Sequence, residues 1–116
     1  MPRFVVLTHD HPVLHWDLML DNGDALRTWR LARPPDADED VIAEPLADHR
    51  RAYLDYEGPV SGGRGEVRRW DAGDFALLEE NSDQIRLRLD GAKLKGVATI
   101  ELSGDDALAR FYFTTD

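Results

Sequence analysis

Short runs of alternating apolar and polar residues, each followed by turn residues, occur along the whole chain. In the clearest run, Leu14, Trp16, Leu18 and Leu20 alternate with polar residues and a methionine. Alternation with period two is typical of strands that have two different faces, whereas a helical period is weakly suggested only at residues 44–54. The pattern therefore predicts an all-β fold, a small antiparallel β-barrel or sandwich of about eight short strands with little helix. We favour the barrel, because closure removes exposed strand edges.

Turn signals and loops divide the chain into the expected strands. Strands are expected at 4–7, 14–20, 25–31, 66–70, 75–79, 85–89, 93–102 and 107–114, with a further one at 41–46 that Pro45 interrupts. Turns are expected at Asn22-Gly23, 71–73, 81–83, 90–91 and 103–105. The acidic, proline-containing stretch 33–40 and the glycine-rich stretch 58–65 predict loops. With 116 residues and no internal repeat, we expect one domain over residues 1–116.

The N-terminal segment and the lack of cysteine restrict the protein class. The chain has no cysteine, which excludes disulfide bonds, thiolate zinc sites and a cysteine nucleophile. Its first apolar run, residues 4–7, is shorter than the roughly 7–15 residues of a secretory signal. No stretch approaches the roughly 20 apolar residues of a membrane span. We therefore expect a cytoplasmic protein with no membrane partner.

The charge balance argues against broad nucleic-acid binding. The chain has 14 basic and 23 acidic residues, a formal net charge of −9. Such a balance disfavours a protein that covers a long stretch of phosphate backbone. Eight of the basic residues lie between Arg27 and Arg69, interleaved with the acidic run 36–40. A few placed cations could still engage a single phosphorylated end.

Three of the four histidines, His9, His11 and His15, fall within seven residues. His15 and Asp17 are two apart on one predicted strand, so both point to the same face, which we interpret as its polar face. Neutral imidazoles and an ionised carboxylate suit a divalent metal. The spacing is equally compatible with a solvated strand face that binds nothing.

His49 and Tyr53 lie four residues apart, away from the histidine cluster. From its position alone, His49 fits a metal ligand, a general acid or a surface residue. Tyr53 fits either a core residue or an active-site hydroxyl.

An ordered set of motifs resembles the 3′-phosphoesterase domain of bacterial DNA ligase D. FVVLTHD at 4–10 and LHWDLML at 14–20 are similar to the family's F-V-V-x-x-H-D and L-H-[YW]-D-[FL]-R-L. LRTWRLARPP at 26–35, ADHRRAYLDYEG at 47–58 and LDGAKLKG at 89–96 resemble later family motifs, and 62–74 matches loosely. Together they cover roughly residues 4–102, and the order of the set is more specific than any single motif.

The resemblance implies a small β-barrel that carries a metal-dependent phosphoesterase. It implies a divalent metal, manganese first, held by His9, His15 and Asp17. It also implies that His49 and Tyr53 contact the scissile phosphate. The family's reactions trim a 3′-terminal ribonucleotide and remove the remaining 3′-phosphate, which leaves a 3′-OH for end joining.

Further residues are assigned from this resemblance. Arg33 aligns with a family lysine, and Arg33 and Arg51 are our candidates for binding phosphate. Arg50 and Arg64 are further candidates, each also compatible with a solvated surface role. Asp10 is expected to support the ligands. The implied partners are the 3′ end of DNA or of RNA-primed DNA, or a smaller phosphoester, together with end-joining proteins.

The sequence departs from the family at the position two residues after Asp17. The family has an arginine there, and this chain has Met19. Val41 and Pro45 also stand where basic residues are expected. Because lost cations weaken phosphate binding, a metal-binding accessory module with weakened or no catalysis is the alternative function. A more remote alternative is a non-haem iron oxygenase barrel, since a His-x-Asp pair and a later histidine, His49, also occur there.

Overall fold

The computed structural model describes residues 2–103 and 108–116, and these residues form an antiparallel all-β fold, as expected. They contain nine strands and one turn of 3₁₀ helix. The elements are β1 (Arg3–His9), β2 (His15–Asp21), β3 (Leu26–Leu31), β4 (Val41–His49), η1 (Arg51–Leu54), β5 (Gly58–Pro59), β6 (Glu66–Glu80), β7 (Gln84–Gly91), β8 (Lys95–Glu101) and β9 (Ala109–Thr115). No helix in the described ranges is long and apolar enough to cross a membrane.

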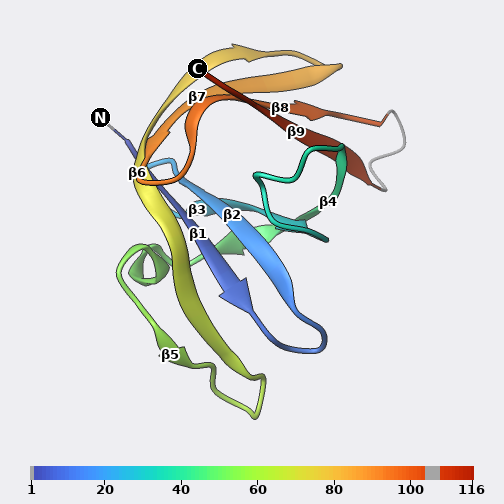
Figure 1. The fold of residues 1–116 in the computed structure, drawn as a ribbon. Coiled ribbons are helices and arrows are strands. Elements are labelled where there is room, and N and C mark those ends of the chain that lie inside the picture. The colour runs from blue at the N-terminus through green and yellow to red at the C-terminus, as the bar shows by residue number, and fades with distance from the viewer. Residues whose placement is uncertain (1, 104–107) are drawn as a thin grey trace.

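The strands form one sheet that closes on itself. Their order is β1-β2-β3-β4-β9-β8-β7-β6-β5, and β1 also pairs with β6, so the sheet returns to its first strand (Figure 1). The long strand β6 makes this possible, because its first half pairs with β1 and its second half with β7. The ring explains the short alternating runs of the sequence, since each strand has one face toward the enclosed space.

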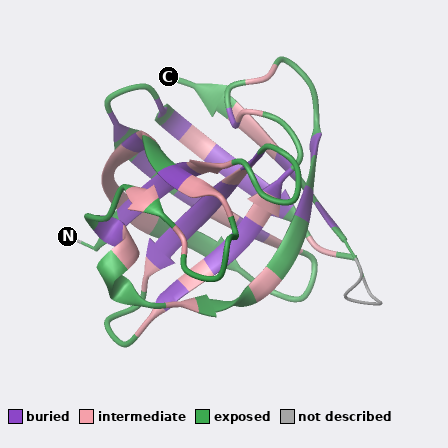
Figure 2. Ribbon diagram, turned by 90° about the horizontal axis from the view of Figure 1, so that it is seen from below, coloured by how far each residue is buried: buried purple, intermediate pink, exposed green. Residues whose placement is uncertain are grey.

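The main core fills the inside of this ring. It includes Phe4, Leu18, Trp29, Leu87 and Phe111, which come from five different strands. The buried segments lie along the strands, and the exposed ones gather in the loops (Figure 2). Each of these side chains removes a large apolar area from water, and burial of one such side chain is worth roughly 1.5–3 kcal/mol.

A second, smaller core lies on the other face of β1 and β2. Val5, Leu7 and Met19 alternate with the residues of the main core and pack with Leu26 and Val67. Leu54 of η1 covers this cluster, with Tyr53 and Val60 against it. The segment between β4 and β6 therefore lies over the outer face of the sheet. Strands β1 and β2 are buried on both faces, and the prediction of a solvated polar face on β2 is wrong.

The turn between β2 and β3 is longer than the predicted two-residue turn at Asn22-Gly23. Residues 22–25 connect the strands, and the Asn22 side chain accepts hydrogen bonds from the backbone of Asp24 and Ala25 at 3.0 Å each. The Asp21 side chain accepts a third from Gly23 at 2.9 Å. Two polar side chains thus stabilise a wider turn, and the strand register shifts by two residues.

Strand β6 is continuous through the predicted turn at 71–73. The Asp71 carboxylate is buried and accepts backbone hydrogen bonds from Ala92, Lys93 and Leu94, at 2.9, 3.1 and 2.8 Å. The aspartate therefore fixes the β7–β8 turn from across the sheet, and the two predicted strands 66–70 and 75–79 are one.

Other elements begin or end a few residues away from the predicted boundaries. The weak helical signal at 44–54 corresponds to the end of β4 followed by η1, and β4 continues through Pro45. The glycine-rich loop at 58–65 includes the two residues of β5. The predicted turn at 103–105 and the start of the last strand lie partly on residues 104–107, outside the described residues.

Candidate metal centre and its cleft

Strand pairing brings His9, His15 and Asp17 together at one end of the β1–β2 hairpin. His9 ends β1 and lies directly opposite His15, which begins β2. Asp17 follows on the same face as His15. One nitrogen from each histidine and one oxygen of Asp17 lie within 4.8 Å of one another. These are the three residues that the sequence grouped as metal ligands.

Backbone carbonyls set which nitrogen of each histidine faces the group. His15 Nδ1 donates to the Val13 carbonyl oxygen at 2.9 Å, and His9 Nε2 donates to that of Arg64 at 2.8 Å. The remaining nitrogens, His15 Nε2 and His9 Nδ1, lie 3.3 and 3.7 Å from Asp17 carboxylate oxygens. Carbonyl partners of this kind fix the tautomer and leave a lone pair for a metal ion.

Burial of these polar atoms without a cation destabilises the folded state. His15 and Asp17 are each only 2% exposed. With His15 neutral and its proton on Nδ1, His15 Nε2 and Asp17 Oδ1 are both acceptors 3.3 Å apart, and neither has a hydrogen-bond donor among the described residues. Buried polar atoms are nearly always paired, because leaving one unpaired costs roughly 1–3 kcal/mol. A divalent ion held by these residues would satisfy both atoms, so the residues fit a metal with nitrogen and oxygen ligands.

The surroundings of His15 raise its pKa. Burial alone lowers it, but the adjacent Asp17 carboxylate and the Val13 carbonyl raise it by more, against a smaller lowering by the Arg30 charge. The net direction is upward from the ordinary value of 6.5. A cation in this group therefore competes with a proton on His15.

An open cleft of about 530 Å³ lies over the metal group. His9, Asp17, His49 and Tyr53 line it, and they also line a narrower inner pocket of about 140 Å³. His49 Nδ1 donates to the Ala47 carbonyl at 2.9 Å, so its Nε2 is the nitrogen that remains to act. The His49 and Tyr53 rings meet edge to face, 5.9 Å between centroids. The structure thus brings both predicted catalytic residues to the predicted metal ligands.

Two arginines that were minor candidates in the sequence border the same space. Arg64 lines the cleft and the inner pocket, and Arg50 lines the cleft. The Arg64 guanidinium is held by Ser61, through Nε to the carbonyl at 2.7 Å and through Nη2 to Oγ at 3.2 Å. Neither arginine forms an ion pair within the described part of the chain.

Arg30 is a site residue that the sequence analysis did not single out. It lies directly opposite Asp17 in the pairing of β2 with β3, and it lines the cleft. Its Nε is buried without a hydrogen-bond partner among the described residues, and its Nη1 lies 3.8 Å from Glu44. With the predicted two-residue turn, Asp17 would lie opposite Thr28 instead. Only the correct length of the 22–25 turn would have indicated Arg30.

The structure places the other predicted phosphate ligands, Arg33 and Arg51, away from the lining of the cleft. Arg51 pairs with Asp21 through two hydrogen bonds, at 2.9 and 2.8 Å. Arg33 forms an ion pair with Glu39 in the acidic loop. Both guanidinium groups are therefore engaged by carboxylates, and their phosphate role stays a prediction.

Asp10, expected to support the ligands, contacts the loop before β6. Its carboxylate accepts a hydrogen bond from the Glu66 backbone at 2.8 Å. This contact fixes the loop whose Arg64 carbonyl holds His9. Asp10 thus reaches the metal group through the backbone of the loop.

Met19 forms part of the wall of the inner pocket. It is 1% exposed and packs in the second core. As expected from the alternation, it shares the face of His15 and Asp17. The position where the sequence resemblance implies an arginine therefore faces the site, but here it supplies an apolar surface.

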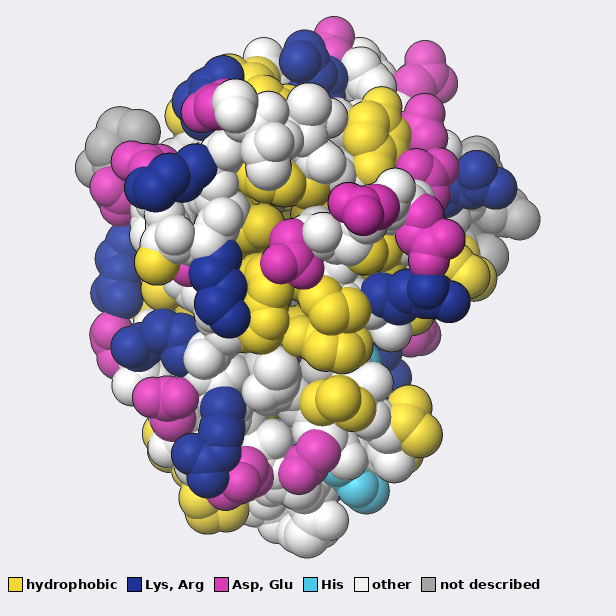
Figure 3. All heavy atoms as spheres, viewed as in Figure 1, with side chains coloured by type: hydrophobic (Ala, Val, Ile, Leu, Met, Phe, Trp, Pro, Cys, Tyr) yellow, Lys and Arg dark blue, Asp and Glu magenta, His cyan; other side chains and the backbone are white. Residues whose placement is uncertain are grey.

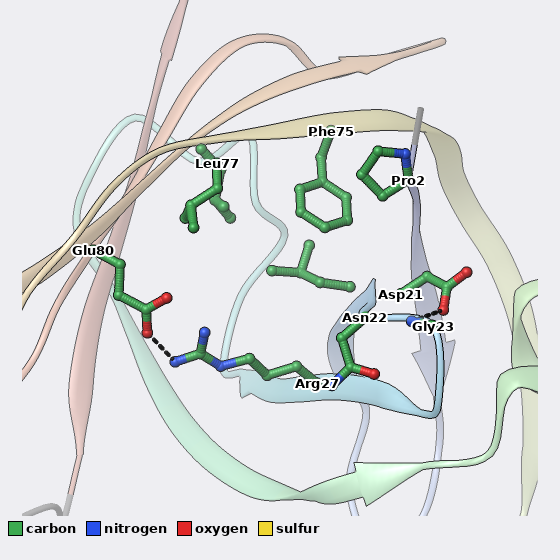
Figure 4. A pocket seen from close by; sticks show the side chains of 10 residues that line it. Pro2, Asp21, Asn22, Gly23, Arg27, Phe75, Leu77 and Glu80 are labelled. Carbon is green, nitrogen blue, oxygen red and sulfur yellow. Dashed lines mark hydrogen bonds and ion pairs between the residues drawn. The ribbon is translucent and has the colours of Figure 1, made fainter.

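A further pocket in the described part of the chain is separate from this site. It has a volume of about 620 Å³, and Leu20, Phe75 and Leu77 contribute apolar walls (Figure 4). Its charged residues are already paired: Arg27 with Glu80 at 2.8 Å, and Asp21 with Arg51. It shares no lining residue with the cleft and contains no histidine. The chemistry of the molecule therefore gathers at the smaller cleft.

Comparison with known proteins identifies a family and a relative that the chain resembles. Residues 7–101 match the family described as the DNA Ligase D 3′-phosphoesterase domain. A curated relative, the Multifunctional non-homologous end joining protein LigD of Pseudomonas aeruginosa (strain PAO1), is 32% identical over 104 residues. The match covers 81% of this chain and 12% of the relative, so the chain corresponds to a small part of that larger protein.

Proposed function

The chain belongs to the family of DNA ligase D 3′-phosphoesterase domains, and from this premise we propose that it removes a phosphate or a ribonucleotide from the 3′ end of a nucleic acid. The proposed cofactor is a divalent metal, with manganese first. The relative from Pseudomonas aeruginosa is named for non-homologous end joining. We propose the same process for this chain, in the cytoplasm and beside other end-joining proteins.

The observation that carries this proposal is the buried, unpaired set of ligand atoms. His15 Nε2 and Asp17 Oδ1 lack partners in the described residues, and His9 Nδ1 lies 3.7 Å from the same carboxylate. A bound metal would neutralise a phosphate oxygen and lower the pKa of a coordinated water. The protein's own contribution is to hold the two histidine ligands in position through the Val13 and Arg64 carbonyls.

His49 and Tyr53 are the proposed catalytic residues. With Nδ1 donating to Ala47, His49 can present Nε2 to the cleft and carry a proton to the leaving oxygen. Tyr53 lines the cleft and the inner pocket beside it, so its hydroxyl can donate to a phosphate oxygen. Tyr53 lies on the segment that covers the outer face of the sheet, and His49 is the last residue of β4.

Three arginines supply positive charge to the same space. Arg64 and Arg50 are unpaired with acids among the described residues, and Arg30 is half-buried opposite Asp17. A guanidinium binds phosphate through a planar pair of N–H groups, so each can add charge-assisted hydrogen bonds. We propose Arg64 as the main phosphate ligand, because it alone of the three reaches the inner pocket.

Met19 supports a second candidate function. Its apolar side chain forms part of the wall of the inner pocket, at the position where the resemblance implies an arginine that would stabilise a phosphate. If Arg64 does not replace that charge, the chain keeps the metal group without effective catalysis and acts as an accessory module. The oxygenase alternative is less well supported, because His49 lies outside the group that meets at Asp17 in the described residues.

A manganese-dependent assay on a labelled primer–template with a 3′-phosphate tests the proposal. We expect phosphate release that chelation stops, and that His15→Ala and His49→Ala abolish. Arg88→Ala is the control, because Arg88 pairs with Asp116 and does not line the cleft. No phosphate release by the native chain, with metal bound, would contradict the enzyme and favour the accessory module.

A further inference from the structure

We propose that a pocket beside the cleft binds the terminal nucleobase of the nucleic acid whose 3′ end reaches the metal group. This inference rests on the proposed function. The pocket has a volume of about 300 Å³. We call it the tyrosine pocket, and its walls include Arg50, Ala52, Tyr53, Tyr56, Pro59 and Val60.

The tyrosine pocket is continuous with the site. Arg50 and Tyr53 line both it and the cleft, and Val60 lines both it and the inner pocket. A ligand with its phosphate at the metal group can therefore extend past Tyr53 without leaving the protein surface. In a nucleotide, the groups next to the phosphate are the sugar and the base that it carries.

The ring of Tyr56 is held in position before any ligand binds. Its hydroxyl donates to the Pro59 carbonyl, and its ring meets that of Tyr53 edge to face, 5.9 Å between centroids and 84° between planes. Gly58 allows this packing: it has φ +139°, and a Cβ there would lie 3.1 Å from the Tyr56 hydroxyl. The ring thus loses little conformational freedom when a flat ligand stacks on it.

The chemistry of the tyrosine pocket favours a base over other apolar groups. Tyr56 is 38% exposed, which is unusual for a large aromatic side chain that is fixed by contacts. Arg50, exposed beside it and in no ion pair among the described residues, can neutralise the phosphate that joins the last two nucleotides. An exposed aromatic ring with a neighbouring arginine is the usual arrangement for binding single-stranded nucleic acid, at roughly 1–3 kcal/mol per stacked base.

Binding of short oligonucleotides with a 3′-phosphate tests this inference without turnover. One oligonucleotide ends in the fluorescent base 2-aminopurine, and the matched one has an abasic terminal nucleotide. Measured in chelator, the native chain should bind the base-bearing end about tenfold more tightly, with quenched fluorescence. Tyr56→Ala should remove this preference. Tyr56→Phe, which keeps the ring and loses the bond to Pro59, should retain most of it.

The controls separate this inference from the proposed function. Equal melting temperatures show that the Tyr56 variants fold, and Arg88→Ala should bind like the native chain. If Tyr56→Ala keeps the preference, or the native chain binds both ends equally, the base site is disproved whatever the enzyme does. If base-dependent binding is present but manganese gives no phosphate release from either oligonucleotide, the base site stands and the proposed phosphoesterase activity fails.

Discussion

His15 couples the metal group to pH. Its pKa is raised, because the Asp17 carboxylate and the Val13 carbonyl outweigh the effect of burial. A metal ion needs the neutral imidazole, so manganese affinity should fall as the pH decreases through a value above 6.5. Calorimetry from about pH 5 to pH 9 measures this, with proton release counted from buffers of different ionisation enthalpy. An affinity that is constant across this range would contradict the assignment of His15 as a ligand.

In the metal-free protein, His15 contributes more to folding stability at acidic pH, whereas metal affinity is expected to be lower there. A raised pKa in the folded state stabilises the fold below the ordinary histidine pKa. This contribution disappears as the pH rises through the raised value. With chelator present, His15→Ala should therefore lower the melting temperature by more at acidic pH than at alkaline pH. An equal change at both would show that Asp17 does not stabilise the charged imidazole.

Substitution of His49 should lower phosphate release without lowering manganese affinity, unlike substitution of a metal ligand. We expect His49→Gln to lower phosphate release by roughly 10²- to 10⁴-fold, the usual range for loss of a general acid. Manganese affinity should stay unchanged, because His49 lies outside the group that meets at Asp17 among the described residues. Calorimetry alongside the 3′-end assay makes this comparison. Loss of metal binding in the variant would mean that His49 is a ligand.

Met19→Arg restores the charge that the family pattern has at this position. Because Met19 is buried in the second core, the change should lower the free energy of unfolding by roughly 1–3 kcal/mol. It should also strengthen binding of inorganic phosphate, since the side chain borders the inner pocket. Denaturation curves and phosphate titrations test both parts. Unchanged phosphate binding in a folded variant would indicate that Arg64 already supplies the required charge.

Single residues were predicted well where spacing alone decides. The His15-x-Asp17 pair points to one face of a strand in any register, and His9 meets it across a short hairpin. Arg30 was missed because its place depends on the turn length, which the Asn22 side chain sets. The burial of His15 and Asp17 was also missed, since the covering segment comes from more than 30 residues away.

At the scale of elements, the loop before β6 carries much of the site. Its Arg64 holds His9 by its carbonyl and faces the cleft by its side chain. Gly65 follows with φ +75°, and a Cβ there would lie 2.2 Å from the Asp10 carboxylate. This close approach lets Asp10 accept its hydrogen bond from Glu66.

Gly65→Ala should therefore disturb two functions at once. The added methyl group displaces Asp10, releases the loop and weakens both manganese binding and phosphate release. Gly23→Ala is the matched control, because Gly23 also has positive φ but a Cβ there meets nothing within 4 Å. Calorimetry and the 3′-end assay on both variants provide the test. Equal, small effects would show that the loop is held by other contacts.

The type of the elements was predicted, but several of their ends were not, the strands predicted at 66–70 and 75–79 are one, and β5 was not predicted. Alternation marks the strands because each has one face in the ring. The Asp71-Ala72-Gly73 sequence was misread as a turn. An aspartate in a turn often accepts hydrogen bonds from the backbone of that same turn, whereas Asp71 accepts them from the turn between β7 and β8. The sequence does not distinguish the two cases. Such long-range partners carry no local signal.

At the scale of the whole molecule, charge limits how much nucleic acid can be bound. One face of the protein shows basic and acidic side chains interspersed, with no continuous basic area (Figure 3). Many of the arginines are paired with carboxylates, as Arg33 and Arg51 are. The net charge of −9 is therefore consistent with an enzyme that grips one end through a few placed cations.

Binding should thus depend weakly on salt and on length. With two or three phosphate contacts, the slope of log affinity against log salt should be roughly −1.5 to −2 for single strands. Lengthening the oligonucleotide beyond a few nucleotides should add little affinity. Titrations at several salt concentrations, with a short and a long strand, measure both. A steep slope that grows with strand length would indicate a backbone footprint that the charge distribution does not support.

The two cores on opposite faces of β2 separate folding from chemistry. The main core inside the ring holds the strands together, whereas Met19 belongs to the second core, and His15 and Asp17 lie on the same face of β2 as Met19. Substitutions at the site therefore change the small cluster and leave the enclosed core intact. A lineage carrying this domain can lose or exchange the side chains that line the cleft and still produce a well-folded protein, so the persistence of the fold in a genome says little about the persistence of any reaction.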